Sequence, residues 1–417
     1  MTNPQNRTPE TQAGTVPAPW LTILGVGVDG VEGLEPRACE ALSAAQMVFG
    51  GERHLAMVQT LIRGETRVWS SPIAESIAEL LSKRGTPVAV LASGDPFYFG
   101  IGASIRPHVK PSEMRVFPAL SAAALAAARL GWAQQDVTTV SLCGRKLESL
   151  RPHLQPGGQL FVLSADSTTP AKVAAELVER GFGPTRMHVL EQLGGQDQRH
   201  RMVQAAHFDF NDIDPLNMMA LEVEADPVAQ VIPVVPGRPD DLFEHEGQIT
   251  KSEVRAVTLS NLSPRPGELL WDVGTGSGSI AIEWLLSASR MRAIGIDQRE
   301  DRIAAARANA ASLGVPNLKL RSGHAPEVLE GLPTPQAIFI GGSGSREVFE
   351  AAWAALAPGG RLVANAVTLE TLALLTELRK QWGGRMVRIS VERADAVGSY
   401  QAFRPAMSIV QYVGIKP

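Results

Sequence analysis

The sequence contains few cysteines, few aromatic residues and no excess of basic charge. Its 417 residues include only Cys39 and Cys143, which lack the CxxC or Cys/His spacing of a metal site. We therefore expect no metal, and the simplest interpretation of the cysteines is a reduced, cytoplasmic setting. The formal charge of −4 leaves no surplus of Lys and Arg for a phosphate backbone, which argues against nucleic acid as a partner or substrate.

Long apolar runs are also missing. The longest run of small apolar residues, around 119–130, contains Arg129 and is too short to span a bilayer, so we expect no membrane segment. Residues 1–19 are rich in Pro, Thr, Gln and Asn and have no apolar segment of the signal-peptide kind, which predicts a disordered tail. The 44% of apolar residues is typical of a globular protein.

Length and pattern together predict two α/β domains. At roughly 150 residues per domain, the chain is long enough for two or three. From Trp20 onward, short apolar runs closed by glycine alternate with helical spacing, as in parallel-sheet proteins. Prolines and acidic residues interrupt this pattern between 226 and 250. We therefore place the boundary near Gly237 to Asp241, between domains 20–237 and 238–417.

The second domain is predicted to contain another open sheet of Rossmann-like type. The pattern predicts helices at 251–262, 278–288 and 300–313 and strands at 269–273, 292–297, 317–321 and 336–340. The two domains share a glycine-rich loop after a first strand but cannot be aligned further, so they are interpreted as fused rather than duplicated.

A glycine-rich turn and an acidic strand end indicate a nucleotide site in this second domain. The loop contains Gly274, Thr275, Gly276, Ser277 and Gly278 where a buried strand turns into a helix, so main-chain N–H groups can approach a ligand. Asp297 ends the next strand, where an acid can accept hydrogen bonds from both ribose hydroxyls. These features predict an adenosine-bearing cofactor. The alternative interpretation is a tight strand-to-helix turn that binds no ligand.

Two details favour S-adenosylmethionine over NAD, which is the runner-up. Ser279 stands where the dinucleotide fingerprint requires its third glycine. Asp272, directly before the loop, carries a charge that suits an ammonium and a sulfonium and would repel a pyrophosphate. Asp272 could equally be an anchor that orders the loop.

The segment after the fourth strand indicates the class of methyl acceptor. It reads IFIGGSG (338–344) rather than the Asn/Asp-Pro-Pro-Tyr run with which many amine methylases hold a planar nitrogen. A carbon nucleophile in a conjugated ring needs mainly positioning in line with the sulfonium methyl group, so a glycine-lined acceptor site is adequate. A flexible surface loop is the alternative.

Several motifs of the second domain resemble one family. TKSEVR (250–255), WDVGTGSGSIAIE (271–283), SGHAPEVL (322–329) and LAPGGRLVANAVTLE (356–370) together resemble the corrin-pathway methylases that act at C15 and decarboxylate an acetate side chain. The resemblance implies that the cofactor contacts are Thr250, Gly274, Thr275, Gly276, Ser277, Gly278, Asp297, Gly323, His324 and Ala325. The family often has Gly-Asp-Ala-Pro where this chain has His324, so backbone groups or a neutral imidazole must replace an aspartate at the adenine amino group.

The first domain resembles a different family. GVGVDG (25–30), VFGGERHL (48–55), ASGDPFYFGIG (92–102) and PALSAAALAAARLGW (118–132) resemble the tetrapyrrole methylases, most closely the corrin C5 branch. That resemblance implies two α/β lobes with the cofactor in the cleft between them.

The same resemblance supplies the expected site residues of the first domain. It implies a cofactor loop at Gly94, Asp95 and Pro96, further cofactor contacts at Ser121 and Ala122, and a substrate trough beside Gly25 and Gly27. Many relatives read G-x-G-P-G after the first strand, whereas this chain has Val28 and Asp29. Asp29 is therefore a substrate-binding candidate whose role stays open.

Both resemblances on one chain imply the family of fused precorrin-6Y C5,15-methyltransferases (decarboxylating) of cobalamin synthesis. This implies one S-adenosylmethionine per half, methylation at C5 by the first half, and methylation at C15 with loss of the C12 acetate carboxyl by the second, giving precorrin-8. The implied partner is a small corrin precursor, and relatives of the second half suggest a homo-oligomer, a tetramer through that half.

Because such a substrate is polyanionic, we hypothesise that Lys251 and Arg255 pair with its carboxylates; solvated helix-face charges are the alternative. Two other function classes stay open at this point. The chain could methylate an unrelated hydrophobic acceptor, or one half could be a degenerate binding module.

Overall fold

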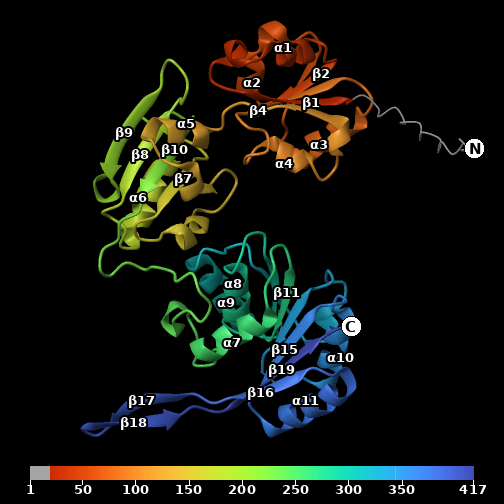
Figure 1. Cartoon of the computed structure of the whole chain (residues 1–417), viewed down its shortest axis with the longest axis vertical. Helices are drawn as coiled ribbons and strands as arrows, with labels where there is room; N and C mark the ends of the chain where they lie inside the picture. Colours follow the sequence, from red (N-terminus) through yellow and green to blue (C-terminus); the bar gives the residue numbers. More distant parts are fainter. Residues whose placement is uncertain (1–18, 343) are drawn as a thin grey trace, which may run out of the picture. The chain divides into compact units, whose positions relative to one another are not determined.

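The computed structural model describes residues 19–342 and 344–417 and divides the chain into two compact units (Figure 1). Residues 1–18 of the expected tail lie outside the described residues. Unit 1 comprises the chain up to Cys143 together with Gln159–Glu179 and Gly183–Glu222, and unit 2 comprises Gly144–Gly158, Arg180–Phe182 and Val223–Pro417.

The boundary expected from the proline-rich segment falls inside unit 2. Ile232 is buried in a small core with Phe243 and Ile282, and the main-chain N–H of Gly237 donates to Glu283 Oε2 at 2.7 Å. This segment therefore packs on unit 2 as part of its structure, although its prolines exclude regular helices and strands.

The first sheet of unit 1 is parallel and buried on both faces. Its strand order is β3 (Glu65–Val68), β2 (Met47–Gly50), β4 (Val88–Ser93), β1 (Leu21–Val26) and β5 (Met114–Phe117). One face packs on α1 (Pro36–Ser43) and α2 (Glu52–Met57). The other packs on α3 (Ile73–Ser82) and α4 (Ile101–Ile105). Continuous apolar strands such as LTILGV follow from this two-sided burial.

The second sheet of unit 1 is mixed. Its order is β6 (Thr138–Ser141), β7 (Gln159–Leu163), β10 (Asn217–Glu222), β8 (Arg186–Glu191) and β9 (Arg199–Gln204), with only β6 and β7 parallel. The alanine-rich helix α5 (Ala122–Leu130) packs closely on this sheet because its small side chains allow a short approach. The apolar spacing of AKVAAELVERG (171–181) is typical of an amphipathic helix, and α6 (Thr169–Glu179) occupies this segment.

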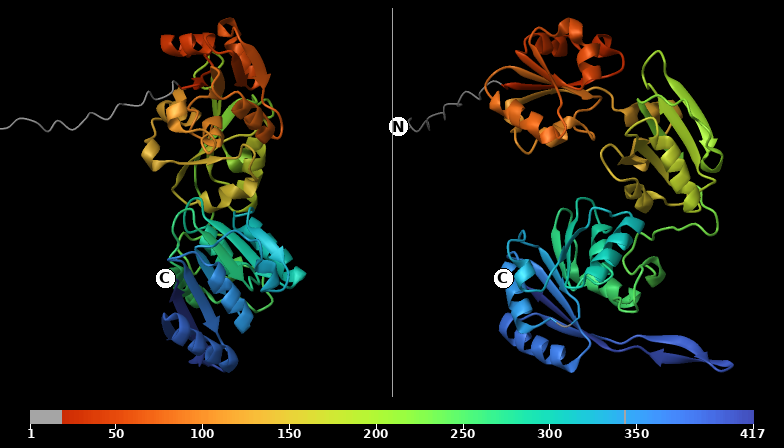
Figure 2. Two further views of the ribbon diagram at one scale, coloured as in Figure 1. Left: turned by 90° about the vertical axis from the view of Figure 1, so that its right-hand side faces the viewer. Right: turned by 180° about the vertical axis from the view of Figure 1, so that it is seen from behind.

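Unit 2 contains a seven-stranded sheet with helices on both faces (Figure 2). The order is β13 (Lys319–Ser322), β12 (Arg292–Asp297), β11 (Leu269–Val273), β14 (Ala337–Ile340), β15 (Arg361–Ala366), β19 (Ile409–Ile415) and β16 (Arg385–Ile389). The first five are parallel, and β19 runs antiparallel to both neighbours.

The helices of unit 2 confirm the predicted order. One face of the sheet carries α7 (Ser252–Leu262) and α8 (Ser279–Leu285), and α9 (Glu300–Ser312) lies beside α8. The other face carries α10 (Arg346–Ala355) and α11 (Leu369–Trp382). Every helix and strand predicted between 251 and 340 is present, with ends that differ from the prediction by at most three residues.

A two-stranded hairpin, β17 (Glu392–Val397) and β18 (Tyr400–Pro405), projects from the sheet of unit 2 (Figures 1 and 2). All of its residues are exposed. In the part of the chain that the structure describes, no helix is both long and apolar enough to cross a membrane.

Candidate functional site

Unit 2 has a cavity of about 840 Å³ at the C-terminal ends of its central strands. Parallel strands bind ligands at this edge because the strand-to-helix loops open there. Nine of the ten expected cofactor contacts line the cavity: Thr250, Gly274, Thr275, Gly276, Ser277, Asp297, Gly323, His324 and Ala325.

Gly278, the tenth expected contact, does not line this cavity. It is the residue before α8, and its φ of +79° is a conformation that favours glycine. A Cβ there would lie 3.0 Å from the Cβ of Ala306 on α9. The prediction is corrected for this residue: Gly278 allows two helices to pack closely and does not contact the cavity.

Asp297 connects the end of β12 to the glycine loop. Its carboxylate is 4% exposed; Oδ2 accepts the N–H of Gly276 at 3.0 Å and Oδ1 accepts the N–H of Arg299 at 3.1 Å. Each carboxylate oxygen can accept two hydrogen bonds. Asp297 can therefore hold the loop and still accept from a ribose hydroxyl.

Asp272 is buried beneath the same loop. Its Oδ2 accepts the hydroxyl of Thr275 at 2.7 Å and the N–H of Ala281 at 3.1 Å, as expected of an anchor. Burial raises the pKa of Asp272 to about 6, although these hydrogen bonds oppose the rise. Its Oδ1 is buried without a hydrogen-bond partner among the described residues. This site thus fits a cofactor that carries positive charge.

The two basic candidates differ in position. Arg255 is fully buried, and its guanidinium is engaged by Glu283 Oε1 at 2.7 Å, Asp240 Oδ1 at 3.1 Å and the carbonyl of Thr250. We therefore correct its assignment: Arg255 fixes the position of Thr250 and cannot reach a substrate. Lys251 lines the cavity, is 41% exposed and lies 3.4 Å from Asp240, so it remains a candidate.

The acceptor side of the cavity includes residues that were expected and residues that were not. Gly341 and Gly342 line it, as the IFIGGSG segment predicted, while Ser343 lies outside the described residues. Asn365 at the end of β15 was not predicted; its Oδ1 accepts from buried Gln411 at 2.8 Å and its Nδ2 donates to Thr258 at 3.3 Å. Asn365 lies within the family motif at 356–370, but the motif does not show its role, because its partners Gln411 and Thr258 lie far away in sequence.

Unit 1 has a second cavity, of about 440 Å³, whose wall comes from both of its sheets. Of the predicted residues, Gly27, Gly94, Ser121 and Ala122 line it. The hydroxyl of Ser121 accepts the N–H of Ala124 at 3.1 Å and thereby caps α5.

The other predicted residues of unit 1 lie outside the cavity wall. The carboxylate of Asp95 accepts the N–H of Phe97 at 2.8 Å and so orders the turn, and Pro96 is buried behind it. Gly25 allows close packing, since a Cβ there would lie 2.0 Å from the carbonyl oxygen of Gly94. Asp29 is exposed and lies against Gly33, which leaves its role in substrate binding a prediction.

The second sheet supplies contacts that the sequence did not single out as site residues. Cys143, Leu163, Ser164, Asn217 and Met218 line the cavity. Ser164 Oγ and Asn217 Oδ1 are buried without a hydrogen-bond partner among the described residues. Buried polar atoms normally have partners, so this wall fits a polar ligand such as the adenosine-bearing cofactor.

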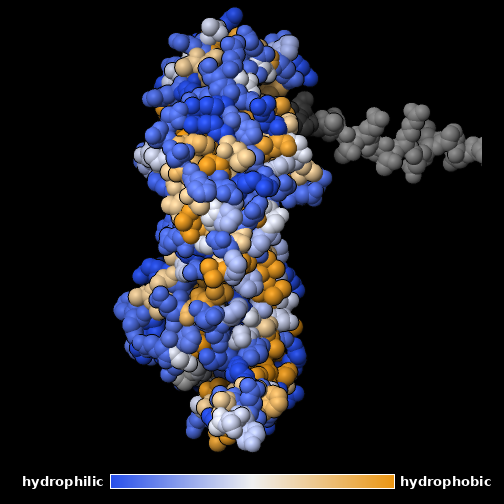
Figure 3. Space-filling model, turned by 90° about the vertical axis from the view of Figure 1, so that its left-hand side faces the viewer, coloured by the Kyte–Doolittle hydropathy of each residue, from blue (hydrophilic) through white to orange (hydrophobic). Residues whose placement is uncertain are grey.

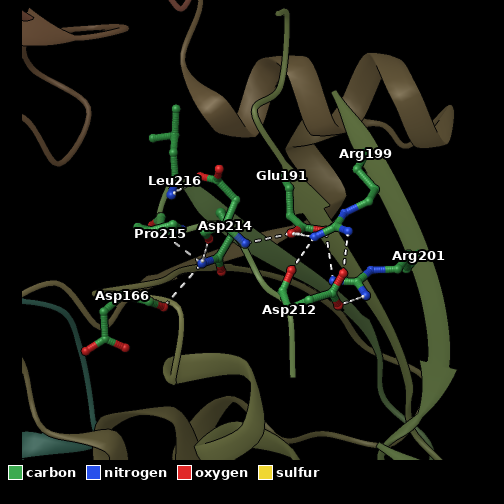
Figure 4. A network of polar contacts seen from close by, with 9 residues as sticks. Asp166, Glu191, Arg199, Arg201, Asp212, Asp214, Pro215 and Leu216 are labelled. Atoms are coloured by element: carbon green, nitrogen blue, oxygen red, sulfur yellow. Dashed lines mark hydrogen bonds and ion pairs between the residues drawn. The ribbon is translucent and has the colours of Figure 1, made fainter. Parts of the chain in front are cut away.

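An ionic network holds the loop that leads into β10 and its first residue, Asn217 (Figure 4). Glu191 is 1% exposed and accepts from Arg199 at 2.6 Å, from Arg201 at 3.2 Å and from the N–H of Asp214 at 2.8 Å. Burial alone would raise the pKa of Glu191, but these donors hold it below its usual value. The position of the loop is therefore fixed, because Glu191 of β8 and the two arginines of β9 bind its residues Asp212 and Asp214.

Comparison with known proteins agrees with this geometry. The sequence model of the tetrapyrrole (corrin/porphyrin) methylases matches residues 21–208, and that of the precorrin methyltransferase domain matches residues 241–416. A precorrin-6Y C(5,15)-methyltransferase [decarboxylating] from Sinorhizobium sp. is 49% identical over 396 residues, which cover 95% of this chain and 96% of the relative. The chain belongs to the family of precorrin-6Y C(5,15)-methyltransferases (decarboxylating).

Members with one reaction each also match. A probable cobalt-precorrin-6B C(15)-methyltransferase (decarboxylating) from Saccharolobus solfataricus is 41% identical over 146 residues, 33% of this chain and 73% of the relative. A cobalt-precorrin-7 C(5)-methyltransferase from Salmonella typhimurium is 31% identical over 181 residues, 43% of this chain and 88% of the relative. The chain is thus an S-adenosylmethionine-dependent, decarboxylating C-methyltransferase of cobalamin biosynthesis, as the sequence predicted.

Proposed function

We propose that the two cavities work as separate active sites, each with one S-adenosylmethionine. Unit 1 methylates the corrin precursor at C5, and unit 2 methylates it at C15 and removes the C12 acetate carboxyl, to give precorrin-8. The observation that carries this proposal is the presence of two cavities on unrelated folds, each with buried polar groups suited to the cofactor. The two single-reaction relatives, each matching part of the chain, support the same division.

We further propose that the reaction of unit 2 comes first. The relative that acts at C15 is named for precorrin-6B, whereas the relative that acts at C5 is named for precorrin-7. If the numbering follows the order of the intermediates, the product of unit 2 is the substrate of unit 1.

Lys251 is the proposed substrate-binding residue of unit 2. Lys251 lines the cavity next to Thr250, and a carboxylate of the substrate can replace or join Asp240 as the partner of its ammonium. Decarboxylation leaves an electron pair that a protonated ring imine of the substrate can accept, so the protein needs chiefly to bind the acetate and control protons. Lys251→Ala with unchanged substrate affinity and turnover would remove Lys251 from this role.

The division is tested with full-length variants that each damage one cavity. Mass spectrometry of the precursor after incubation with Gly94→Ala, altered in unit 1, should show one methyl gained and one carbon dioxide lost. Asp297→Ala, altered in unit 2, should slow that first step instead. Loss of the decarboxylating step in Gly94→Ala would contradict the division.

Cofactor stoichiometry separates this proposal from a degenerate half. Equilibrium titration of the full chain should show two cofactor sites. A single site, abolished by either variant alone, would mean that one unit only supports the other.

The hairpin of unit 2 supports self-association, which we propose as a tetramer. Tyr400 is 79% exposed and Phe403 is 71% exposed, and exposed aromatic side chains of this size are typical of interaction surfaces. Where the hairpin points toward the viewer, at the lower end of Figure 3, hydrophobic and hydrophilic residues lie side by side. Sedimentation of Phe403→Ser should show smaller species than the unaltered chain if the hairpin forms the contact.

A reducing, cytoplasmic location is likewise proposed. Cys39 and Cys143 are both free thiols, and Cys143 is exposed on the cavity wall of unit 1. Such thiols persist where glutathione keeps them reduced. Fractionation that placed the protein in an oxidising compartment would overturn this.

A further inference from the structure

Three polar side chains form a cluster on the cavity wall of unit 1: Arg53, His54 and Ser93. Arg53 and His54 lie on α2, and Ser93 ends β4 directly before the predicted cofactor loop. His54 Nε2 lies 2.8 Å from Ser93 Oγ and 3.1 Å from Arg53 Nη2, and Arg53 Nη2 lies 3.4 Å from the same hydroxyl. None of the three has a role in the site described above.

The imidazole of His54 is a hydrogen-bond acceptor in this cluster. Burial, and then the charge of Arg53, lower the pKa of His54 to about 4, so the ring is neutral at neutral pH. Because the guanidinium can only donate, Nε2 must accept from Arg53, and the ring proton then lies on Nδ1. His54 and Ser93 thus fix the guanidinium against the wall without neutralising its charge.

Arg53 has no carboxylate within ion-pair distance among the described residues. Other arginines of unit 1 have such partners: Arg67 is 3.0 Å from Glu79, and Arg199 is 2.6 Å from Glu191. The negative charge of Asp214 acts on Arg53 from a distance, but desolvation outweighs it and lowers the pKa of the guanidinium. Arg53 is nevertheless an exposed residue of the cavity wall, and its guanidinium has no counter-ion in the described part of the chain, so an anion that enters the cavity can pair with it.

The surrounding wall indicates the shape of the ligand that carries this anion. Tyr98, Phe99 and Leu120 line the same cavity, and they are 41%, 44% and 68% exposed. The rings of Tyr98 and Phe99 meet edge to face, with centroids 5.0 Å apart. A flat apolar body with a carboxylate at its edge matches an apolar wall beside a single cation.

We propose that Arg53, held by His54 and Ser93, is the carboxylate-binding group of the unit 1 cavity. Two ligands of the reaction proposed for unit 1 carry carboxylates: the tetrapyrrole, on its side chains, and S-adenosylmethionine, on its amino-acid end. Arg53 donates two parallel N–H bonds to the carboxylate, while His54 and Ser93 are positioning residues.

Full-length Arg53→Gln and Arg53→Lys test the proposal, with Arg106→Gln as the matched control. Arg106 is an exposed arginine of the same lobe outside the cavity wall. All variants carry Asp297→Ala, so that cofactor binding reports mainly on unit 1. Two affinities are measured: that of the C15-methylated tetrapyrrole by absorbance titration, and that of S-adenosylmethionine by calorimetry, with 5′-methylthioadenosine as a probe that lacks the carboxylate.

We expect Arg53→Gln to weaken one of these ligands by about ten-fold or more, as loss of a charge-assisted hydrogen bond requires. If only tetrapyrrole binding is weaker, Arg53 binds a carboxylate of the substrate. If S-adenosylmethionine binds more weakly while the affinity for 5′-methylthioadenosine is unchanged, Arg53 binds the carboxylate of the cofactor. Arg53→Lys should recover part of the loss because it keeps the charge, and Arg106→Gln should bind both ligands as the parent does.

Unchanged affinity of Arg53→Gln for both carboxylate ligands would overturn the proposal, and so would an equal loss for 5′-methylthioadenosine, which indicates a damaged cavity. The proposed function fails in a different way. If unit 1 methylates a carbon other than C5, Arg53→Gln still loses its ligand, and only the position of the methyl group in the product differs.

His54→Gln gives a second, smaller readout. Gln keeps an acceptor near Arg53 but not the rigid ring, so the same ligand should weaken by about three-fold. The KM for that ligand should rise more than kcat falls, because a positioning residue acts on binding. An effect on kcat alone would overturn the positioning role.

Discussion

The cavity of unit 2 is built from one sheet, whereas that of unit 1 lies between two. In unit 2, Asp272 and Asp297 come from adjacent strand ends, so one glycine loop unites both carboxylates with the cavity. In unit 1 the loops at Gly94 and Ser121 face polar atoms of Ser164 and Asn217 from another sheet. Under the proposal of one cofactor per unit, the same cofactor is held by carboxylates in unit 2 and largely by backbone, hydroxyl and amide groups in unit 1. The two sites should therefore respond to different substitutions.

Gly94→Ala should have the largest effect and should act on unit 1 alone. Gly94 has φ +57°, and a Cβ there would lie 2.7 Å from the carbonyl oxygen of Leu120. The left-handed conformation costs about 1–2 kcal/mol for alanine, and the main-chain clash moves the loop. We expect cofactor binding to unit 1 to fall by about a hundred-fold or more, measured by two-site calorimetry on the full chain.

Gly85→Ala is the matched control. Gly85 also has a positive φ, +93°, but nothing lies within 4 Å of its Cβ position and it does not line the cavity. Gly85→Ala should lower the free energy of unfolding but leave the affinity for the cofactor unchanged. Equal binding losses in both variants would mean that strain, not the shape of the cavity, accounts for the result.

Asp297→Ala should weaken cofactor binding to unit 2 and leave unit 1 unchanged. The variant loses hydrogen bonds to the ribose worth about 1.5–3 kcal/mol, or roughly ten- to a hundred-fold in affinity. It also frees the N–H of Gly276, which Asp297 now binds at 3.0 Å. Asp297→Asn keeps one acceptor oxygen and should lose less. Calorimetry that shows unaltered affinity in both variants would remove Asp297 from the site.

Asp272→Asn should change how the stability of unit 2 depends on pH. The pKa of Asp272 is raised to about 6 in the folded chain, so the native state binds this proton more tightly than the unfolded state does. The ionised carboxylate therefore costs stability increasingly as pH rises from about 4 to about 6. The neutral amide avoids this cost.

Urea unfolding of unit 2 at pH 5 and pH 8 measures this effect. The stability of Asp272→Asn relative to the unaltered chain should increase by about 1–2 kcal/mol between these two pH values. The comparison is made without cofactor, because a bound ammonium would itself favour the ionised carboxylate. A difference that does not vary with pH would contradict the raised pKa.

How much of each site the sequence predicts follows from how each is built. In unit 2 the glycines, Asp297 and Ala325 lie in strand-to-loop motifs, and local patterns locate them. Arg255 was misassigned because helical spacing does not show that Glu283, 28 residues away, meets it in the core. Gly278 was misassigned because a glycine that faces a helix has the same pattern as one that faces a ligand.

In unit 1 the motifs predict the part of the cavity formed by the loops at Gly94 and Ser121, and not the wall formed by the strands of the second sheet. Asn217 begins β10 and Ser164 directly follows β7, and these two strands are brought together by antiparallel pairing over a long sequence distance. The network of Glu191 with Arg199 and Arg201 positions that wall, and no local pattern indicates it. Residues whose function depends on such long-range pairing are visible only in the folded chain.

His324→Asp should give the smallest effect, and it should be a gain. His324 is exposed on the wall of the unit 2 cavity, at the position where the family resemblance implies an aspartate. A carboxylate there can accept from the adenine amino group. Hydrogen bonds to charged groups contribute about 1.5–3 kcal/mol, and the exposed position of His324 favours the lower end of that range. We expect roughly ten-fold tighter cofactor binding to unit 2.

Two comparisons separate an adenine contact from a general charge effect at His324. His324→Asn supplies an acceptor without the charge and should give part of the gain, whereas His324→Ala should be close to the unaltered chain. A cofactor analogue without the exocyclic amino group should bind His324→Asp no better than the parent. If the affinities of the cofactor and of the analogue increase equally, the new carboxylate attracts the sulfonium charge at long range. Cofactor binding to unit 2 would then depend on the total negative charge of the cavity and not on a contact with the adenine amino group.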